Sequence, residues 1–377
     1  MRNRLFVSLS FLISFSLTAF AIPRFAAKMN LACQSCHVNP SGGGMRNAFG
    51  ESFGRDSLSV KSWQQEYALD DFSTKLSEFL TYGADFRFLA YYQSRNNPDA
   101  SVSSFFPMQT DLYFNLAVSK KISLFINPAF GPYNRLEAFG IAKVLPANGY
   151  IKLGRFTPPY SLRIDDHTSF IRQATPFRNG MGQQTGVELG FRSGFLSAMG
   201  AVTNGMRGDL DGNVAKAVFG KLEGAGELGP FRVLAGVASY NDVSSTEKLN
   251  LLGGYGVATF MEKLTIIGDV ERIQGNSSSM STSSDLNQRI APGTDLKQLA
   301  FMIEADYPLF QGFDLKVMYD FFDPNTDVKT GTAVRYSGGF EFMPMSGVEL
   351  RPLVRYTKDT ILNRNITDLQ LMVHLFL

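Results

Sequence analysis

The sequence contains little cysteine, histidine or tryptophan and has no excess of either charge. Its 377 residues include two cysteines, three histidines and one tryptophan. A zinc site at the two cysteines would need two more ligands nearby, and the whole chain has only three histidines. Lys and Arg total 36 against 34 Asp and Glu, so the charge gives no reason to expect a nucleic-acid partner.

Long apolar runs are also missing beyond the N-terminus. No later segment has about eighteen consecutive apolar residues, so we expect no other membrane-spanning helix. Mean hydropathy is −0.05 although 33 Phe and 14 Tyr are present. The apolar residues are therefore dispersed among polar ones, which is typical of alternating strands rather than membrane helices.

The first 21 residues have the pattern of an export signal. Two early arginines precede an apolar stretch at residues 5–17, and Ala19-Phe20-Ala21 fits the small-x-small cleavage rule. We therefore expect a signal peptide over residues 1–21 and a mature chain that starts at Ile22. A retained signal anchor is the alternative, because the apolar stretch is nearly long enough to span a bilayer.

Both cysteines lie in one motif, Cys33-Gln34-Ser35-Cys36-His37. The spacing provides two thiols for the vinyl groups of a haem and an imidazole for its iron, so it predicts one covalently bound haem c. Three alternatives compete. A thioredoxin-like thiol pair needs a βαβ setting that does not follow, zinc needs more ligands, and a plain disulfide leaves His37 without a role.

Residues 22–75 form the expected haem-binding segment. The segment contains a flexible turn, Pro40-Ser41-Gly42-Gly43-Gly44, and too few apolar residues for a core of its own. We therefore expect the rest of the chain to cover its haem.

The remaining residues, 76–377, alternate apolar and polar side chains with period two, as strands do. A soluble sandwich also alternates. Strands of about ten residues or more, aromatic residues near their ends, and connections of alternating length favour a transmembrane barrel instead. The clearest runs are 81–90, 299–307, 313–321 and 348–356; short turns are expected at 119–120, 146–149, 192–194, 224–229, 262–263, 310–312 and 343–347, and long loops at 157–183 and 274–295.

The pattern predicts an all-β fold, an outer-membrane β-barrel of about sixteen transmembrane strands. An even strand number leaves both ends of the barrel on the periplasmic side, so the haem-binding segment enters there. We expect it to fold into the lumen as a plug, because a charged inner wall suits a polar plug. In the last strand, Leu369, Leu371 and Leu375 should face lipid, while Met372 and His374 face the lumen.

A short N-terminal c-type haem motif followed by a porin-like barrel resembles the fused monohaem cytochrome–porins. Pro23-Arg24-Phe25-Ala26 before the motif and Asn47-Ala48-Phe49-Gly50 after it carry the resemblance. That family includes outer-membrane iron oxidases. The resemblance implies one haem c, a periplasmic c-type cytochrome as partner, outer-membrane lipid around the barrel and an extracellular redox partner. Whether the chain is an Fe(II) oxidase, and so an enzyme, stays open.

The sixth ligand of the haem iron has several candidates. His167 lies in the long loop 157–183, which in porins folds inward, and His374 faces the lumen near the periplasmic mouth. Met29 and Met45 flank the motif and would give His/Met ligation. Each also has a structural interpretation, as a solvated loop histidine, a lumen-lining residue or packing around the ring.

Charged residues near these candidates suggest further roles. Asp165 and Asp166 could hold an incoming Fe(II), or form an Asx turn or an ion pair with Arg163 or Arg172. Haem propionates could pair with basic residues close to the motif, namely Arg24, Lys28, Arg46 and Arg55.

Two classes of function remain. In the first, the protein conducts electrons between an extracellular donor or acceptor and periplasmic cytochromes. In the second, it is a diffusion porin whose haem segment serves sensing or tethering. A plugged lumen favours the first class of function. Covalent haem favours it too, because haem has no evident role in passive diffusion.

Overall fold

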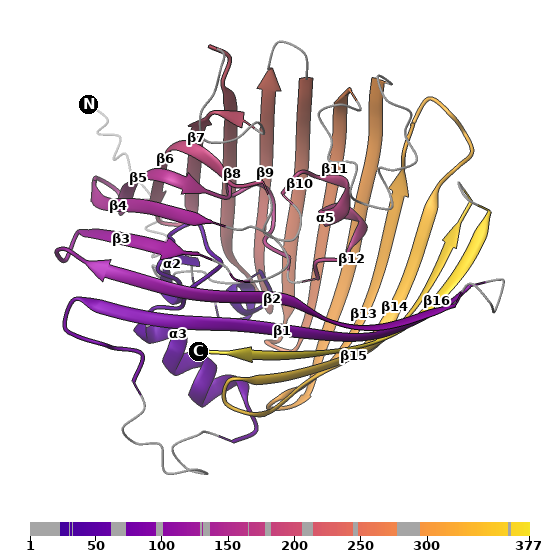
Figure 1. The fold of residues 1–377 in the computed structure, drawn as a ribbon, viewed down its shortest axis with the longest axis horizontal. Helices are drawn as coiled ribbons and strands as arrows, with labels where there is room; N and C mark the ends of the chain where they lie inside the picture. The colour runs from indigo at the N-terminus through magenta and orange to yellow at the C-terminus, as the bar shows by residue number, and fades with distance from the viewer. Residues whose placement is uncertain are drawn as a thin grey trace, which may run out of the picture.

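Within the residues that the structure describes, sixteen antiparallel strands form one closed barrel (Figure 1). Each strand pairs with its neighbours in the sequence, and β1 closes the ring by pairing with β16, from Asp85 opposite Phe376 to Arg95 opposite Ile366. The predicted all-β barrel and its strand number are confirmed. The strands are β1 (Leu80–Arg95), β2 (Val102–Ala117), β3 (Ile122–Asn127), β4 (Glu137–Leu145), β5 (Gly149–Phe156), β6 (Gln184–Ser193), β7 (Leu196–Thr203), β8 (Ala217–Leu228), β9 (Phe231–Val243), β10 (Lys248–Phe260), β11 (Leu264–Asn276), β12 (Asp295–Phe310), β13 (Phe313–Asp323), β14 (Ala333–Met345), β15 (Val348–Asp359) and β16 (Arg364–Phe376).

The computed structural model does not describe every part of the chain. It describes residues 23–29, 31, 33–61, 73–95, 101–128, 130, 136–164, 166–177, 182–205, 214–243, 248–276, 295–360 and 363–377. The predicted signal peptide lies outside these ranges. Among the helices inside them, none combines the length and the apolar composition that a membrane crossing requires.

The two faces of the strands differ as the sequence pattern predicts. In β16, Leu369 and Leu371 are 48% and 42% exposed, whereas Met372 and His374 are each 3% exposed. Other exposed strand side chains are also apolar, for example Val187, Val237, Leu252, Val317 and Val354. An apolar outer wall around a polar interior is the arrangement of a bacterial outer-membrane barrel, and the chain has that fold.

The short turns lie together at one end of the barrel, close to where the sequence predicts them. Pro146–Gly149 and Phe260–Lys263 each close with a backbone hydrogen bond of 3.0 Å. Their central residues have positive φ, 54° and 50° at Ala147 and Asn148, which defines type I′ turns that match strand twist.

One predicted turn is wrong. The sequence suggests a turn over residues 224–229, but β8 continues to Leu228, and Gly224 and Gly226 pair with Ala235 and Val233 of β9. The connection contains only Gly229 and Pro230. Ladder hydrogen bonds hold the two strand glycines extended, so their conformational freedom does not end the strand.

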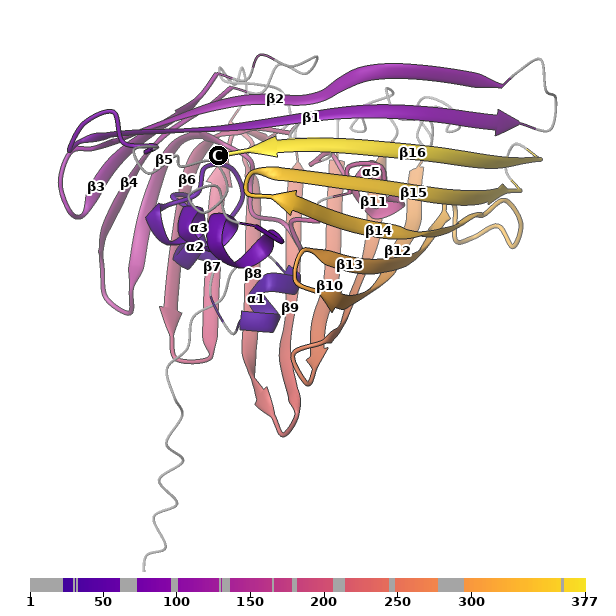
Figure 2. The same cartoon turned by 90° about the horizontal axis from the view of Figure 1, so that it is seen from below.

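The segment that the sequence predicts to bind haem lies inside the ring of strands, at the short-turn end (Figure 2). Its helices are α1 (Pro23–Met29), α2 (Cys33–Cys36) and α3 (Ala48–Phe53), followed by the π-helical turn η1 (Gly54–Leu58). We call the described residues of 23–61 the plug. The amide of Val60 donates to the carbonyl of Met343 at 3.0 Å, so the end of the plug is joined to β14 beside a short turn.

Buried polar contacts connect the plug to the inner wall. Arg24 forms an ion pair with Glu341 of β14. Lys152 of β5 is fully buried, with Glu188 at 2.6 Å, and donates to Asn39 at 3.2 Å and Ser41 at 3.0 Å. The plug therefore neutralises and hydrogen-bonds groups on the wall that water would otherwise solvate.

The long connection between β5 and β6 also folds into the lumen. We call its described residues, 157–164, 166–177 and 182–183, the inward loop. Its helix α5 (Phe170–Ala174) contacts β11, β12 and β13, and the amide of Phe170 donates to Asp320 at 3.0 Å. Arg163 of this loop donates to the carbonyl of Ser41 at 3.3 Å, so the loop and the plug meet inside the barrel.

Replacing Lys152 with Met tests the buried link between wall and plug. The change leaves the Glu188 carboxylate buried without its cation, so we expect a loss of about 3–5 kcal/mol in the free energy of unfolding and faster proteolysis of the plug. Urea unfolding in detergent and limited proteolysis measure both effects. Lys329→Met, at an exposed lysine, is the control, and equal stability of the two variants would contradict this account.

Candidate functional site

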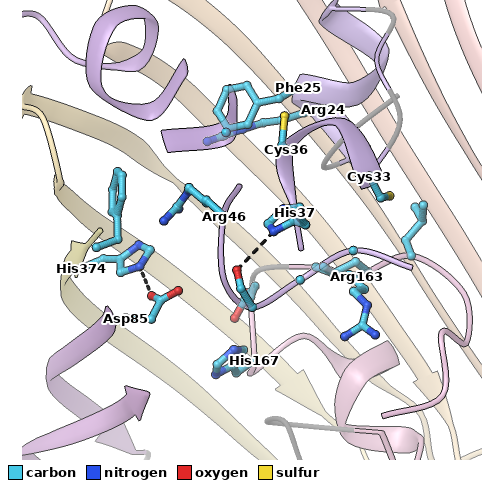
Figure 3. Close-up of a pocket in the computed structure, with 18 of the residues that line it drawn as sticks. Arg24, Phe25, Cys33, Cys36, His37, Arg46, Asp85, Arg163, His167 and His374 are labelled. Carbon is cyan, nitrogen blue, oxygen red and sulfur yellow. Dashed lines mark hydrogen bonds and ion pairs between the residues drawn. The ribbon is translucent and has the colours of Figure 1, made fainter. Parts of the chain in front are cut away.

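A cavity of about 290 Å³ lies between the plug and the inward loop. This volume is close to the lower end of the roughly 300–1,000 Å³ typical of ligand pockets. Both cysteines and all three histidines of the chain line it (Figure 3): Cys33, Cys36 and His37 from the plug, His167 from the inward loop and His374 from β16. The structure thus brings together the two cysteines and three histidines that the sequence singles out for haem attachment and ligation.

The haem motif is one helical turn with a folded return. Cys33–Cys36 form α2, and the amide of His37 donates to the carbonyl of Cys33 at 3.0 Å. The chain then doubles back, with Val38 donating to Met45 at 3.1 Å. The return requires glycine, because Gly42, Gly43 and Gly44 have φ of 86°, 77° and 67°.

His37 has the orientation and charge state of a metal-binding imidazole. Its Nδ1 lies 3.2 Å from the carbonyl oxygen of Gly44, which only accepts, so Nδ1 carries the proton and Nε2 keeps its lone pair. Burial lowers the pKa of His37 to about 4, and the charge of Arg46 adds to the effect. The ring is therefore neutral near pH 7, with its tautomer set by a backbone carbonyl as in metal sites.

The two thiols are not joined to each other in the structure. Burial raises the pKa of Cys33 to about 11, so its thiol stays protonated at neutral pH. Two thiols and a neutral imidazole on one helical turn, all bordering the same cavity, are the donor set that covalent haem attachment requires. The residues present therefore fit one haem c.

Asn47 and Gly50 hold α3 against the haem motif. The side chain of Asn47 caps α3 by accepting from the amide of Gly50 at 3.0 Å, and donates to the carbonyl of Gln34 at 3.2 Å. A Cβ on Gly50 would lie 2.1 Å from the carbonyl oxygen of Cys36. An Asn at a helix start is the sequence signal that could have indicated the capping role of Asn47. It gives no indication of the contact between α3 and α2.

Both ring nitrogens of His374 are engaged by carboxylates. Nδ1 lies 2.8 Å from Glu349 of β15, and Nε2 contacts Asp85 of β1. The histidine faces the lumen at the short-turn end, as predicted. Beside it, the guanidinium of Arg46 lies 4.3 Å from the ring centroid of Phe376, so the plug packs directly on the last strand.

His167 is buried in the inward loop, with its Nε2 3.4 Å from the guanidinium of Arg87 in β1. An arginine only donates, so Nε2 accepts with its lone pair and carries no proton. The imidazole is therefore in the neutral form that can bind a metal.

Asp166 next to it has a structural role in the described residues. Its carboxylate accepts from the amide of Thr168 at 2.8 Å, which confirms the predicted Asx turn, and pairs with Arg355 of β15 at 2.5 Å. The ion-pair partner given for Asp166 in the structure is Arg355 rather than Arg163 or Arg172, so the loop folds onto the β15 wall. Asp165 lies outside the described residues.

The remaining sequence candidates divide between the cavity and other places. Met29 is 42% exposed, and Met45 is buried near Gly83 and Tyr113; neither borders the cavity. Arg24 and Arg46 line it, whereas Arg55 pairs with Asp56. Sequence reasoning missed Arg87 of β1, which lines the cavity, and it considered Arg163 and Arg172 of the inward loop only as partners for Asp165 or Asp166, although both line the cavity too.

Fold and site together define a porin-like outer-membrane barrel whose lumen holds a plug, an inward loop and a cavity between them. No family model and no curated protein matches the sequence. Solved outer-membrane proteins match the fold. OprB of Pseudomonas putida covers 87% of this chain and 100% of its own, with TM-score 0.63 and 9% identity.

Two further solved structures have the same architecture. OmpT of Vibrio cholerae covers 81% of this chain and 100% of its own, with TM-score 0.56 and 10% identity. An anion-selective porin from Comamonas acidovorans covers 79% of this chain and 99% of its own, with TM-score 0.54 and 12% identity. At these identities the similarity establishes the barrel fold.

Replacing Gly50 with Ala tests the packing of α3 on the haem motif. The added methyl group would overlap the Cys36 carbonyl, so we expect a loss of roughly 1–3 kcal/mol and faster tryptic cleavage within the plug. Gly54→Ala is the matched control, because its Cβ would meet no atom closer than 3.5 Å. Equal cleavage rates in the two variants would show that α3 does not depend on this contact.

Proposed function

We propose that the protein is a monohaem cytochrome–porin that moves electrons across the outer membrane. One haem c, attached through Cys33 and Cys36 and ligated by His37, exchanges electrons with an extracellular donor or acceptor and with a periplasmic c-type cytochrome. Fe(II) is one donor that the family resemblance implies. When bound, the haem supplies reversible one-electron chemistry at its iron.

The observation that carries the proposal is the content of the cavity. Two cysteines and three histidines are the chain's whole complement of these residues, and all five border one space. A diffusion pore has no use for such a gathering, whereas a covalently held haem needs two thiols and an axial imidazole. The neutral, buried His37 is ready for the proximal position.

His167 is the better candidate for the second axial position. Its Nε2 carries no proton and accepts from Arg87 at 3.4 Å, a hydrogen bond that iron ligation would replace. His374 would have to leave two buried carboxylates, one 2.8 Å from Nδ1, and uncompensated buried carboxylates are costly. We therefore assign His167 to the iron and His374 to the wall of the cavity.

Other residues of the cavity suit the rest of a haem. Arg46, Arg87 and Arg163 border it, and guanidinium groups bind carboxylates such as the propionates. Phe25, Leu162 and Met302 line other parts of the same space and would exclude water from the apolar ring edge. These side chains bind and orient the group; they carry no electron themselves.

The alternative is a diffusion porin with an accessory haem segment. The plug and the inward loop occupy the lumen from opposite sides and touch at Ser41 and Arg163, which favours electron transfer over diffusion of solutes. A conduit also accounts for the entry of the plug from the periplasmic end, because the haem then lies near its periplasmic partner.

Electron transfer across a sealed membrane tests the proposal. Liposomes that contain the protein would trap an oxidised c-type cytochrome inside and receive Fe(II) or dithionite outside. We expect the trapped cytochrome to become reduced, and no reduction with the Cys33→Ala/Cys36→Ala variant. A high ion conductance in planar bilayers together with no reduction of the trapped cytochrome would support the diffusion porin instead.

Single histidine variants test the axial assignment. We expect His167→Ala to convert the low-spin spectrum of the oxidised haem completely to a high-spin one, because the iron loses a strong-field ligand. His374→Ala should keep the low-spin spectrum. The opposite result for the two variants would assign the ligand to His374, and both spectra unchanged would exclude histidine at the sixth position.

A further inference from the structure

One part of the short-turn rim is basic and carries no acidic residue. Turns 118–121, 143–149 and 192–196 contain Lys120, Lys121, Lys143 and Arg192 but no Asp or Glu. Backbone hydrogen bonds place these turns side by side: Lys143 donates to Lys121 and Arg192 donates to Ala147, each at 2.8 Å. We call these three turns the basic rim.

The three lysines of the basic rim are available for a partner. Lys120, Lys121 and Lys143 are exposed, and among the described residues none of the three ammonium groups has an ion-pair partner. The next part of the rim differs. There Arg232 pairs with Glu227 at 3.4 Å and with Glu262 at 2.7 Å, so its charges cancel.

A second, smaller hollow of about 40 Å³ connects the basic rim with the haem motif. Cys33 and Gln34 border it from the plug, and Asn148, Arg192 and Phe195 border it from the turns. Cys33 also lines the main cavity. This side of the motif is therefore the one that faces the rim through open space.

We propose that the basic rim is the docking face for an acidic soluble redox protein and that Cys33 marks the side where electrons leave or enter. The inference rests on the proposed function, and it adds that the periplasmic partner carries a negatively charged surface. A haem held by Cys33, Cys36 and His37 would supply one electron, its iron passing from Fe(II) to Fe(III), and one oxidised centre of the partner would accept that electron. No bond is formed and no proton moves.

Charge complementarity favours this partner. Opposite potentials accelerate the encounter of two redox proteins and orient them, while leaving the complex weak enough to turn over. Anionic phospholipid headgroups are the other conceivable occupant of exposed lysines. Arg192, however, borders the hollow together with the lumen-side residues Ser197 and Glu223, so part of the basic rim points into the barrel mouth and away from lipid.

Binding of a protein probe of known charge tests the inference. The native protein in phosphatidylcholine nanodiscs would be titrated with reduced plastocyanin, which is acidic, and with mitochondrial cytochrome c, which is basic. We expect plastocyanin to bind and the affinity to fall as ionic strength rises. The variant Lys120→Glu/Lys121→Glu/Lys143→Glu should weaken plastocyanin binding by about tenfold or more and strengthen binding of cytochrome c.

The control carries the same charge change at the opposite end of the barrel. Lys248→Glu/Lys329→Glu/Lys358→Glu replaces three exposed lysines near the long loops and should bind plastocyanin as the native protein does. Equal weakening in both triple variants would overturn the inference, as would no weakening in either. The inference would also be overturned if the rim variant kept its affinity for plastocyanin and lost only a preference of the native protein for phosphatidylglycerol over phosphatidylcholine nanodiscs. The lysines would then bind lipid headgroups.

Haem content separates failure of this inference from failure of the proposed function. The Cys33→Ala/Cys36→Ala variant should bind reduced plastocyanin with unchanged affinity, because docking depends on the rim charges. In proteins that carry haem, the rim substitutions should lower the rate of electron transfer to oxidised plastocyanin, relative to the native protein, in parallel with the affinity. Normal haem content and redox activity, together with plastocyanin binding that does not depend on the rim charges, would contradict the docking face and leave the proposed function intact.

Discussion

Charges on the inner wall of the barrel have to be compensated inside the protein, and this constraint determines what fills the lumen. A ring of sixteen strands encloses more space than wall side chains can fill. The wall therefore pairs with chain segments that enter the lumen. Lys152 holds the plug through Asn39 and Ser41, and Arg355 holds the inward loop through Asp166. Without these segments, Arg355 would lose the carboxylate of Asp166 and Lys152 would lose two hydrogen-bond acceptors, and such losses are costly for buried charges.

The same contacts bring the functional side chains together. The plug enters from the short-turn end with Cys33, Cys36 and His37, and the inward loop brings His167 from the wall. Each segment is anchored by hydrogen bonds to the barrel, so the cavity between them has fixed borders. A cavity enclosed in this way suits electron transfer, because preorganised protein groups around a redox centre need to reorganise little when its charge changes. The fold thus supplies a protected position between the two sides of the membrane.

Local patterns of the sequence were sufficient for the barrel and for the haem motif. Period-two alternation predicts the strands, and turn residues such as Ala147-Asn148 predict most connections, because both depend on neighbouring residues only. The extended glycines of β8 were misread, since a ladder partner far along the chain decides their conformation. The placement of His167 and His37 on one cavity, and the pairing of Asp166 with Arg355, depend on how the closed barrel places distant segments. No local pattern carries that information.

An experimental structure of the protein after haem attachment tests the central claim most directly. A cryo-electron microscopy map of the mature protein in nanodiscs would show where the haem lies. We predict density for one haem inside the barrel, between the plug and the inward loop, joined to Cys33 and Cys36, with its iron on His37 and His167. A disulfide between the two cysteines with no haem density, or a haem segment outside the barrel in the periplasm, would contradict the account.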